Sequence, residues 1–343
     1  MAENSDPSTS SLPPATLLQM MTGYWTSQAV YVCAKLGIAD QLVDGPRTAA
    51  ELAISAGADA AALHRLLRAL ASVGVLAETR AWQFSLTPLG ALLRSGTPDS
   101  MRALAIMYGE EQYRSWGDLL YSVRTGQPAF DHVYRMGVFD YFRQNPGAGC
   151  VFNEAMSALT NPLGSAVADA YDFSACGTVV DVAGGHGSLI AAVLRNNPKA
   201  RGILFDLPHV VSGAGEHLAA AGIAERCTSV GGDFFASVPP GGDAYVLKQI
   251  LHDWDDDRCV AILDECRRVM SDHSKVLVIE FVLPPGDEPF FGKWLDLHML
   301  VMAPGARERT AAEYEALFKR ARLALARVLP TAIGLSVVEA API

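Results

Sequence analysis

The chain has 343 residues, of which 50% are hydrophobic and 19% charged, and this apolar fraction excludes a disordered protein. The length predicts two domains. The formal net charge of −10 excludes generic binding to nucleic acid or anionic lipid, because an acidic surface repels phosphate. No apolar run reaches the roughly 18–20 residues of a membrane span. The six cysteines lack a Cys-x-x-Cys spacing, which predicts reduced thiols in a cytoplasmic protein.

The N-terminal part of the chain predicts a short tail followed by a helical domain. Residues 1–14 are rich in Ser, Pro and Thr without a basic or apolar signal segment, so we expect a disordered tail there. Over 15–105 the pattern predicts helices, a hairpin and a further helix. These are a helix over 17–36, a Thr48–Glu51 capping box, a helix over 60–73 capped by Asp59, a hairpin between Val75 and Leu86, and a helix opening at Thr87. This order is typical of a winged helix.

A winged helix raises the possibility of a DNA-binding regulator with a ligand-sensing domain. Between Thr48 and Arg94 the sequence has Arg65, Arg68, Arg80 and Arg94 against three acidic residues, so no basic stripe is present. The pattern therefore favours a packing or dimerisation role for this domain. Residues 106–175 are interpreted as a helical linker that contributes to the pocket for a substrate.

From residue 176 to 343, short apolar strands alternate with helices. The expected strands cover 178–182, 202–205, 228–230, 244–247, 275–281, 325–330 and 335–340. The expected helices cover 188–196, 213–221, 259–270 and 311–322. Such alternation predicts an α/β fold with a doubly wound, Rossmann-like and largely parallel sheet. A short turn between the last two strands adds an antiparallel hairpin at its edge.

A glycine-rich turn, Asp181-Val-Ala-Gly-Gly-His-Gly187, follows the first of these strands and opens a helix. Glycines allow a ligand to approach the backbone, and the helix N-terminus offers N–H donors. The third glycine of a dinucleotide fingerprint is replaced by Ile190, and Asp181 would repel a pyrophosphate but suit a positively charged ligand. A tight turn without any ligand remains the alternative.

Two further acids follow the next strands. Asp206 lies 19 residues after Gly187, where a carboxylate can accept hydrogen bonds from both ribose hydroxyls. Asp233 can accept from an adenine amino group while Phe234 packs on the ring. Each acid alone is more typical of a loop or a cap, but together with Asp181 they predict a nucleoside site. S-adenosylmethionine fits this site better than NAD, because nothing is arranged to hold a pyrophosphate.

His252 follows the fourth strand and is the candidate general base, since its ordinary pKa lies near neutrality. Glu280 and Glu308 end downstream elements, where carboxylates can orient the imidazole and stabilise its protonated form. An ordinary hydrogen-bonded histidine is the alternative that spacing alone leaves open.

Six motifs in one order resemble a known family. They are Phe152-Asn-Glu-Ala-Met-Ser157, Asp181–Gly187, Phe205-Asp-Leu-Pro208, Gly232-Asp-Phe-Phe235, Leu247-Lys-Gln-Ile-Leu-His-Asp-Trp254 and Pro304-Gly-Ala-Arg-Glu-Arg-Thr310. From about residue 17 to residue 340, the chain resembles the S-adenosylmethionine-dependent O-methyltransferases of the plant caffeate and bacterial polyketide-tailoring type.

This resemblance implies a role for each matching residue. His252 would deprotonate an acceptor hydroxyl between Glu280 and Glu308. The implied cofactor contacts are Asp181, Gly184, Gly185, Asp206, Leu207, Gly232, Asp233, Phe234, Lys248 and Trp254. The implied acceptor contacts are Phe152, Met156, Asp253, His298 and Met299, although Phe152 and Met156 are equally typical of helix core. The resemblance also implies the product S-adenosylhomocysteine, a small aromatic acceptor and a homodimer formed through the N-terminal domain. The spacing of His and acids predicts no metal site.

Three positions depart from the family pattern. Ala183 replaces a customary glycine and places a methyl group beside the methionine end of the cofactor, a modest crowding that is tolerated if the local φ is negative. Ala306 replaces a second glycine and is expected to shift Glu308. Leu159 stands where plant members have a pocket histidine, so a plant phenylpropanoid acceptor is not implied. Two further alternatives stay open, namely a hydroxylase-like relative of the same fold and methylation at nitrogen, carbon or sulfur.

Overall fold

The computed structural model of the chain describes residues 13–80 and 82–343. Most of the tail expected over 1–14 therefore lies outside the described residues, and Pro13 and Pro14 already belong to the first helix. The chain divides into two compact units, residues 1–110 and 111–343, and each is described here by itself. Within the described residues, every helix is too short or too polar to cross a membrane.

The first unit is a helical domain with a three-stranded sheet in the order β1-β3-β2. Its elements are α1 (Pro13–Lys35), α2 (Ile38–Gln41), β1 (Arg47–Thr48), α3 (Ala49–Ala56), α4 (Ala60–Ser72), β2 (Leu76–Arg80), β3 (Gln83–Leu86), α5 (Pro88–Ala91) and α6 (Arg102–Gly109). Thr48 and Glu51 form the predicted capping box, and the Asp59 side chain caps α4. The helix–turn–helix–hairpin order of the winged helix is confirmed, with the helix after the hairpin reduced to one turn.

The second unit begins with helices α7 (Glu111–Trp116), α8 (Leu119–Thr125), α9 (Ala129–Tyr134), α10 (Val138–Gln144) and α11 (Pro146–Ala170). The alternating region follows, with β4 (Thr178–Val182), α12 (Ser188–Asn196), β5 (Arg201–Asp206), α13 (Pro208–Val211), α14 (Ala214–Ala220), β6 (Cys227–Gly231), β7 (Ala244–Lys248), the 3₁₀ turn η1 (Leu251–Asp253), α15 (Asp256–Val269), β8 (Lys275–Glu280), α16 (Phe291–Met302), α17 (Ala311–Arg320), β9 (Leu323–Pro330) and β10 (Ser336–Pro342).

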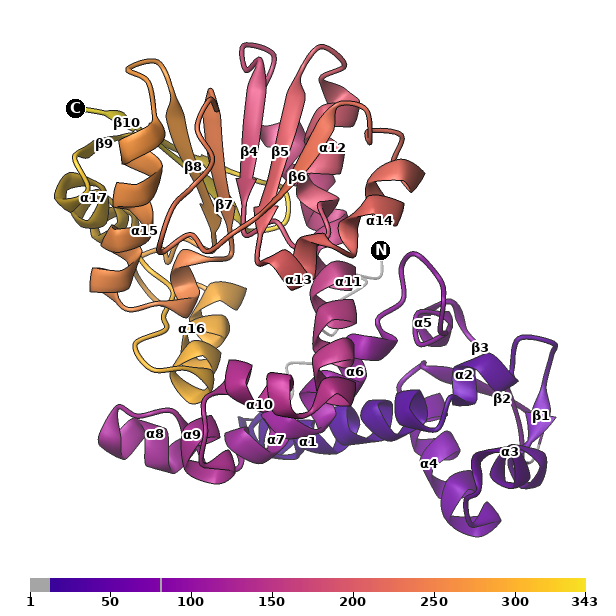
Figure 1. Ribbon diagram of the computed structural model, residues 1–343. Coiled ribbons are helices and arrows are strands. Elements are labelled where there is room, and N and C mark those ends of the chain that lie inside the picture. Colours follow the sequence, from indigo (N-terminus) through magenta and orange to yellow (C-terminus); the bar gives the residue numbers. More distant parts are fainter. Residues whose placement is uncertain (1–12, 81) are drawn as a thin grey trace, which may run out of the picture. The chain divides into compact units, whose positions relative to one another are not determined.

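These strands form one seven-stranded sheet in the order β6-β5-β4-β7-β8-β10-β9 (Figure 1). The five strands from β6 to β8 are parallel, and β10 runs antiparallel to both β8 and β9. Strand β4 lies in the middle of the sheet, and later strands are added outward from it, β5 and β6 on one side and β7 and β8 on the other. The predicted doubly wound sheet with its edge hairpin is confirmed. This order brings the carboxyl ends of β4 and β7 side by side, which is where ligands bind in such sheets.

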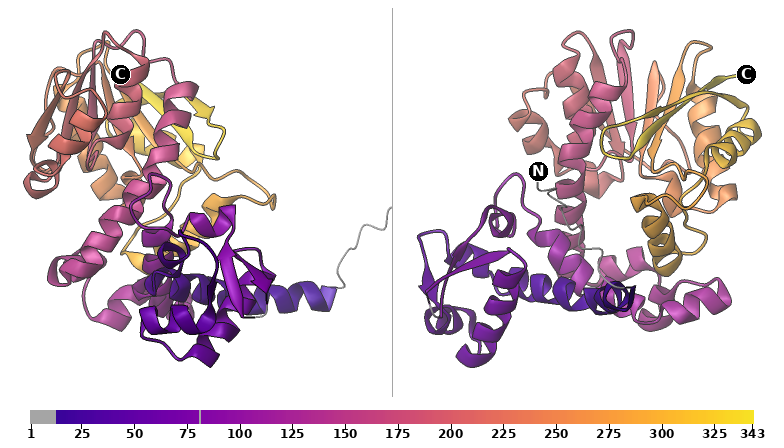
Figure 2. Two further views of the ribbon diagram at one scale, coloured as in Figure 1. Left: turned by 90° about the vertical axis from the view of Figure 1, so that its right-hand side faces the viewer. Right: turned by 180° about the vertical axis from the view of Figure 1, so that it is seen from behind.

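Helices cover both faces of this sheet, because its strands are apolar on both faces (Figure 2). Val180 and Val182 of β4 pack in the cluster that includes α15 and α17, whereas Val179 packs in the cluster that includes α11, α12 and α16. Several expected bounds differ from the structure. The helix expected over 259–270 begins at Asp256, since Asp255 caps it, the strand expected over 325–330 begins at Leu323, and α16 was not expected. Strand β6 ends at Gly231, so that Asp233 lies in the following turn.

Candidate active site

His252 lies in the 3₁₀ turn that follows β7, and a single carboxylate fixes that turn. Glu280, the last residue of β8, accepts hydrogen bonds through Oε1 from the backbone N–H groups of Ile250, Leu251 and His252, at 3.0, 3.1 and 3.4 Å. Glu280 is fully buried, so these donors replace the water that its charge would otherwise require. The flanking acid expected from sequence therefore holds the backbone of the base as well.

A buried arginine holds the same turn from its carbonyl side. Arg309 is 0% exposed and donates to the carbonyl oxygens of Leu251 at 2.8 Å and Trp254 at 2.7 Å. Its Nε and Nη2 also donate to Asp256 Oδ1 at 3.1 and 2.8 Å, and its Nη1 to the carbonyl oxygen of Arg307 at 3.4 Å. The turn is thus held between an anion that accepts from its N–H groups and a cation that donates to its carbonyls. Sequence reasoning missed Arg309, because a buried arginine looks like a surface arginine in a single sequence.

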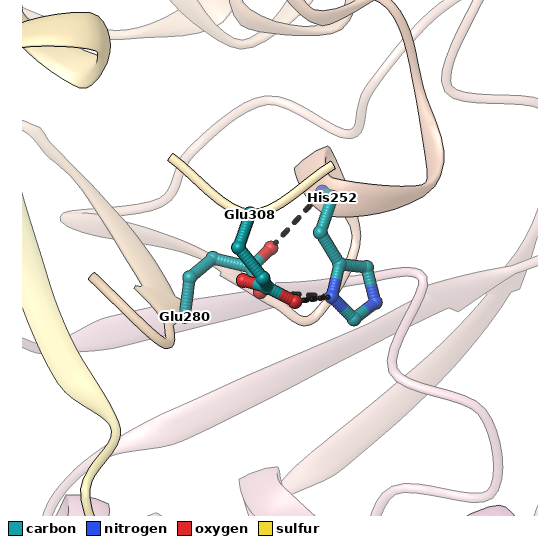
Figure 3. Close-up of side chains that lie close together, drawn as sticks. All are labelled: His252, Glu280 and Glu308. Carbon is teal, nitrogen blue, oxygen red and sulfur yellow. Dashed lines mark hydrogen bonds and ion pairs between the residues drawn. The ribbon is translucent and has the colours of Figure 1, made fainter. Parts of the chain in front are cut away.

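The imidazole of His252 faces carboxylates at both of its nitrogens. Nδ1 lies 2.8 Å from Glu308 Oε1 and 3.5 Å from Glu280 Oε2 (Figure 3). Nε2 lies 3.7 Å from Asp253 Oδ1. Because an ionised Glu308 only accepts hydrogen bonds, Nδ1 carries the proton of this contact. Nε2 is therefore the nitrogen that can take up a further proton.

The charges around His252 make it a strong base. Burial opposes the imidazolium, but Glu280, Asp253 and Glu308 outweigh burial and raise the pKa of His252 to about 10. Burial likewise raises the pKa of Glu280 to about 7, with His252 acting in the opposite direction. Glu308 is held in turn, since its backbone N–H donates to Asp296 Oδ1 at 2.9 Å. Ala306 has no positive φ, and the shift of Glu308 expected from it stays a prediction.

His252, Glu280 and Glu308 are also residue types that can bind a metal cation. One ligand atom each from His252, Glu280 and Glu308 lies within 4.8 Å of the others. The sequence analysis grouped these residues around the base but not as metal ligands, because they lie far apart in the chain and lack a ligand spacing. A reaction without metal is consequently a proposal for this site.

The glycine-rich turn after β4 contains a buried carboxylate with an open lone pair. Asp181 is 2% exposed, and its Oδ2 has no hydrogen-bond partner in the described part of the chain. Burial raises the pKa of Asp181 to about 7, whereas the nearby Lys248 lowers it. A Cβ at Gly184 would lie 2.5 Å from the Asp181 carboxyl carbon, so a side chain at this position would collide with the carboxylate.

Asp206, at the end of β5, links that turn to the neighbouring strand. Its Oδ2 accepts from the backbone N–H of Gly185 at 2.8 Å and its Oδ1 from that of Leu207 at 2.7 Å. Each oxygen keeps a second lone pair, which is what a pair of ribose hydroxyls would require. The structure therefore brings Asp181, Gly184, Gly185 and Asp206 together, as the topology predicted.

Ala183 adopts φ +57°, so the negative φ under which its methyl group was expected to be tolerated is not the conformation of this residue. The left-handed conformation costs an L-residue about 1–2 kcal/mol. Gln249, after β7, is in the same region with φ +52°. Two non-glycine residues with positive φ thus follow adjacent parallel strands at the edge that carries the site.

Aromatic side chains gather beyond the ends of β6 and β7. The ring of Phe235 lies 4.8 Å from that of Phe234 and 4.9 Å from that of Trp254, both nearly edge to face. Asp233 Oδ1 accepts from the backbone N–H of Phe235 at 2.9 Å, which fixes the turn after Gly232. The structure thereby brings together the residues expected to surround an adenine. Lys248 lies between Asp181 and the acids around His252, and burial lowers its pKa.

The expected acceptor residues fall into two groups. His298 and Met299 are buried on α16, and the Nε1–H of Trp116 donates to His298 Nδ1 at 2.8 Å. Phe152 is half-buried on α11 and stacks on Phe142 of α10 with ring centroids 4.6 Å apart. Met156 is half-buried on α11. Sequence reasoning missed Trp116, although an indole that can reach a buried polar partner is a recognisable signal.

Comparison with known proteins identifies the family of this chain. A family model described as an O-methyltransferase domain matches residues 116–323, and one described as an O-methyltransferase dimerisation domain matches residues 18–96. The chain belongs to the S-adenosylmethionine-dependent O-methyltransferase family. It is a methyltransferase, as the motif order indicated, and the DNA-binding alternative is set aside.

Similar proteins cover nearly the whole chain. The phenazine O-methyltransferase PhzM of Lysobacter antibioticus is 57% identical over 327 residues, which are 95% of this chain and 96% of that protein. The crystal structure of LaPhzM has a TM-score of 0.93 at 56% identity and covers 97% of this chain and 100% of that one. An O-methyltransferase from neocarzinostatin biosynthesis, solved with S-adenosylmethionine and 2-hydroxy-5-methyl naphthoic acid, has a TM-score of 0.79 at 35% identity and covers 93% of this chain and 96% of that one.

Proposed function

We propose that this enzyme methylates a hydroxyl group of a small aromatic metabolite and that His252 is its general base. The observation that carries the proposal is the fixed imidazole, with Nδ1 bound to Glu308 and Nε2 left to accept a proton. The phenazine and naphthoate compounds named for the similar proteins are flat and aromatic, so the acceptor proposed for this enzyme belongs to the same chemical class. A phenazinol is therefore the first acceptor to test.

The residues at the ends of β4 to β7 fit S-adenosylmethionine, which supplies an electrophilic methyl group when bound. Asp181 offers a buried carboxylate oxygen that lacks a partner among the described residues, as a positively charged ligand requires. Asp206 offers lone pairs for ribose hydroxyls, and Phe234, Asp233 and Trp254 suit the base. We assign the cofactor to these residues together with Gly184, Gly185, Leu207, Gly232 and Lys248.

Proton removal is the step that this chain's own residues perform. His252 Nε2 accepts the hydroxyl proton, and the positive charge that forms on the ring is stabilised by Glu308 and Glu280 on its other side. General-base assistance of this kind contributes about 10²–10⁴-fold to the rate. Holding the acceptor oxygen in line with the methyl group contributes a further large factor. Asp253, within 3.7 Å of Nε2, faces the same proton.

The proposal includes a homodimer and a reaction without metal. The match to a dimerisation domain over residues 18–96 supports the homodimer. Six large apolar side chains of α1 are between 51% and 73% exposed, which suits burial against a second copy; they are Leu17, Leu18, Met20, Met21, Tyr24 and Trp25.

The decisive experiment measures S-adenosylhomocysteine release with and without 1-hydroxyphenazine and a panel of phenols. We expect acceptor-dependent release by the natural enzyme and a fall of about 10²–10⁴-fold for His252→Ala, with unchanged cofactor affinity by calorimetry. His273→Ala is the matched control, because His273 is exposed before β8. Mass spectrometry of the product distinguishes O- from N-methylation.

Two results would contradict the proposal. Full turnover by His252→Ala would show that another group is the base. Loss of turnover in EDTA, with recovery on adding a divalent cation, would show that His252, Glu280 and Glu308 act as metal ligands instead.

A further inference from the structure

The side chain of Glu308 has few hydrogen bonds that fix its position. Its Oε1 contacts His252 Nδ1 at 2.8 Å, and its Oε2 is buried without a hydrogen-bond partner in the described part of the chain. Glu280 differs, because its Oε1 accepts from three backbone N–H groups of the turn that carries the base. The position of the Glu308 carboxylate therefore depends on where its own backbone is held.

The backbone from Arg307 to Arg309 is held by three different segments. The N–H of Arg307 donates to the carbonyl oxygen of the base at 2.8 Å, and the carbonyl oxygen of Arg309 accepts from a backbone N–H of the segment after β8 at 2.9 Å. Between them, the N–H of Glu308 donates to Oδ1 of Asp296, on α16, at 2.9 Å. A side chain thus anchors the backbone of Glu308, whereas backbone atoms anchor that of its neighbours.

Asp296 is half-buried, and its contact with Glu308 is its sole hydrogen bond within residues 13–80 and 82–343. Burial raises the pKa of Asp296, whereas the N–H of Glu308 and the guanidinium groups of Arg307 and Arg309 lower it. Both arginines donate to Asp256, so neither relies on Asp296 as its partner. The contribution of Asp296 is therefore its acceptor oxygen, which an uncharged amide also provides.

We propose that Asp296 is a positioning residue for the reaction, because it keeps the carboxylate of Glu308 within hydrogen-bond distance of His252 Nδ1. The contact that orients the imidazole and leaves Nε2 to take the proton then depends on α16. This inference rests on the proposed function and adds to it a residue that acts through Glu308 rather than on the reacting atoms.

The test compares a variant that keeps the acceptor with one that removes it. Asp296→Asn retains Oδ1 and loses the charge, whereas Asp296→Ala loses the acceptor and suits the interior of a helix. Asp287→Ala, in the exposed loop before α16, is the matched control. Circular dichroism and the Kd of S-adenosylhomocysteine should be nearly the same in all variants, which separates positioning from loss of the fold.

The first readout is the proton between His252 and Glu308, observed in protein labelled with ¹⁵N-histidine. A charge-assisted hydrogen bond of this length should give a downfield Nδ1–H resonance, which His252→Ala assigns by removing it. We expect the resonance to persist in Asp296→Asn and to move upfield or disappear in Asp296→Ala. Because this readout needs no turnover, its failure is distinguishable from failure of the proposed function, which the release assay tests.

The second readout is kcat in the release assay. Displacement of a positioned group by about 1 Å can cost about 10²-fold, so we expect kcat of Asp296→Ala to fall by about tenfold or more. Asp296→Asn should recover most of this loss. An unchanged resonance and kcat in Asp296→Ala, an equal loss in Asp296→Asn, or no downfield resonance in the natural enzyme would overturn the proposal.

Discussion

At the scale of single residues, His252 binds a proton tightly, so only a small fraction of its imidazole is unprotonated. The buried carboxylates that raise its pKa strengthen its attraction for a proton, but they also keep the ring protonated at neutral pH. A general base works only when it is unprotonated, so the rate must rise with pH through a pKa above the ordinary 6.5 of histidine.

Replacing Glu308 by Gln tests this electrostatic account. Gln keeps an oxygen that accepts from Nδ1 but removes one negative charge, so the pKa of His252 falls. We expect the acid limb of the pH profile of kcat to move to lower pH, while kcat on the alkaline plateau falls by about tenfold or more. Glu315→Gln, exposed on α17, is the control. The acceptor ionises identically in all three enzymes, and an acid limb that stays in place would contradict the account.

The positive φ of Ala183 leads to a second prediction at this scale. Ala183→Gly removes strain of about 1–2 kcal/mol but adds about 0.4–1 kcal/mol of unfolded-chain entropy. We therefore expect the free energy of unfolding to rise by up to about 1.6 kcal/mol, measured as a higher urea midpoint. Gly184→Ala provides the contrast, because its Cβ would approach Asp181 within 2.5 Å and should lower the midpoint. A lower midpoint for Ala183→Gly would show that the local backbone is unstrained.

At the scale of elements, the turn from Ile250 to Trp254 is short and irregular, and it is fixed by charges from other segments. Glu280 arrives from β8 and Arg309 from the loop before α17. Neither partner is near the turn in sequence, so the rigidity of the base depends on the folding of the whole sheet edge.

Arg309→Lys and Arg309→Met measure how much this fixation contributes. A lysine ammonium is a point charge that cannot span both carbonyls as the guanidinium fork does. In protein shown to be folded by circular dichroism, we expect kcat to fall by about tenfold for Lys and further for Met. The Kd of the cofactor should change far less, which separates positioning from general unfolding. Arg320→Met, half-exposed on α17, is the control, and an equal loss of cofactor binding in the Arg309 variants would contradict a positioning role.

The elements themselves were largely predictable, because period and capping signals are local. Strand β4 and helix α12 have the predicted bounds, and the Thr48 capping box forms as expected. The start of α15 was missed because the acidic run from Asp255 to Asp257 looks like a loop, although Asp255 is an N-cap. The φ of Ala183 was missed because the torsion is imposed by the turn and not by the residue.

At the scale of the whole molecule, the site could be predicted only through topology and family pattern. His252 and Glu280 meet because β7 and β8 are neighbours in the sheet, and Glu308 reaches them from the loop before α17. The roles of Arg309 and Trp116 could not be predicted, since each depends on a long-range contact that leaves no periodic signal.

The homodimer is the prediction that belongs to this scale. Light scattering should give twice the chain mass of 36.6 kDa. Trp25→Glu puts a charge on the exposed apolar face of α1 and should shift the mass toward the monomer. Arg65→Glu on the exposed side of α4 is a control that changes charge without changing that face. A natural enzyme with the mass of one chain would contradict the dimer.

Residues with different proposed roles lie at the ends of different strands of the seven-stranded sheet. Strands β4 to β6 end in most of the residues assigned to the cofactor, β7 and β8 lead to the base and its main carboxylate, and helices α7 and α16 hold the Trp116–His298 pair. On the proposed assignments, most acceptor contacts therefore lie on helices and the base lies at the sheet edge. Variation among the helices can recruit new acceptors while Asp296 and the proton-removing apparatus stay constant, which makes α7 and α16 the segments to randomise when a different aromatic product is wanted.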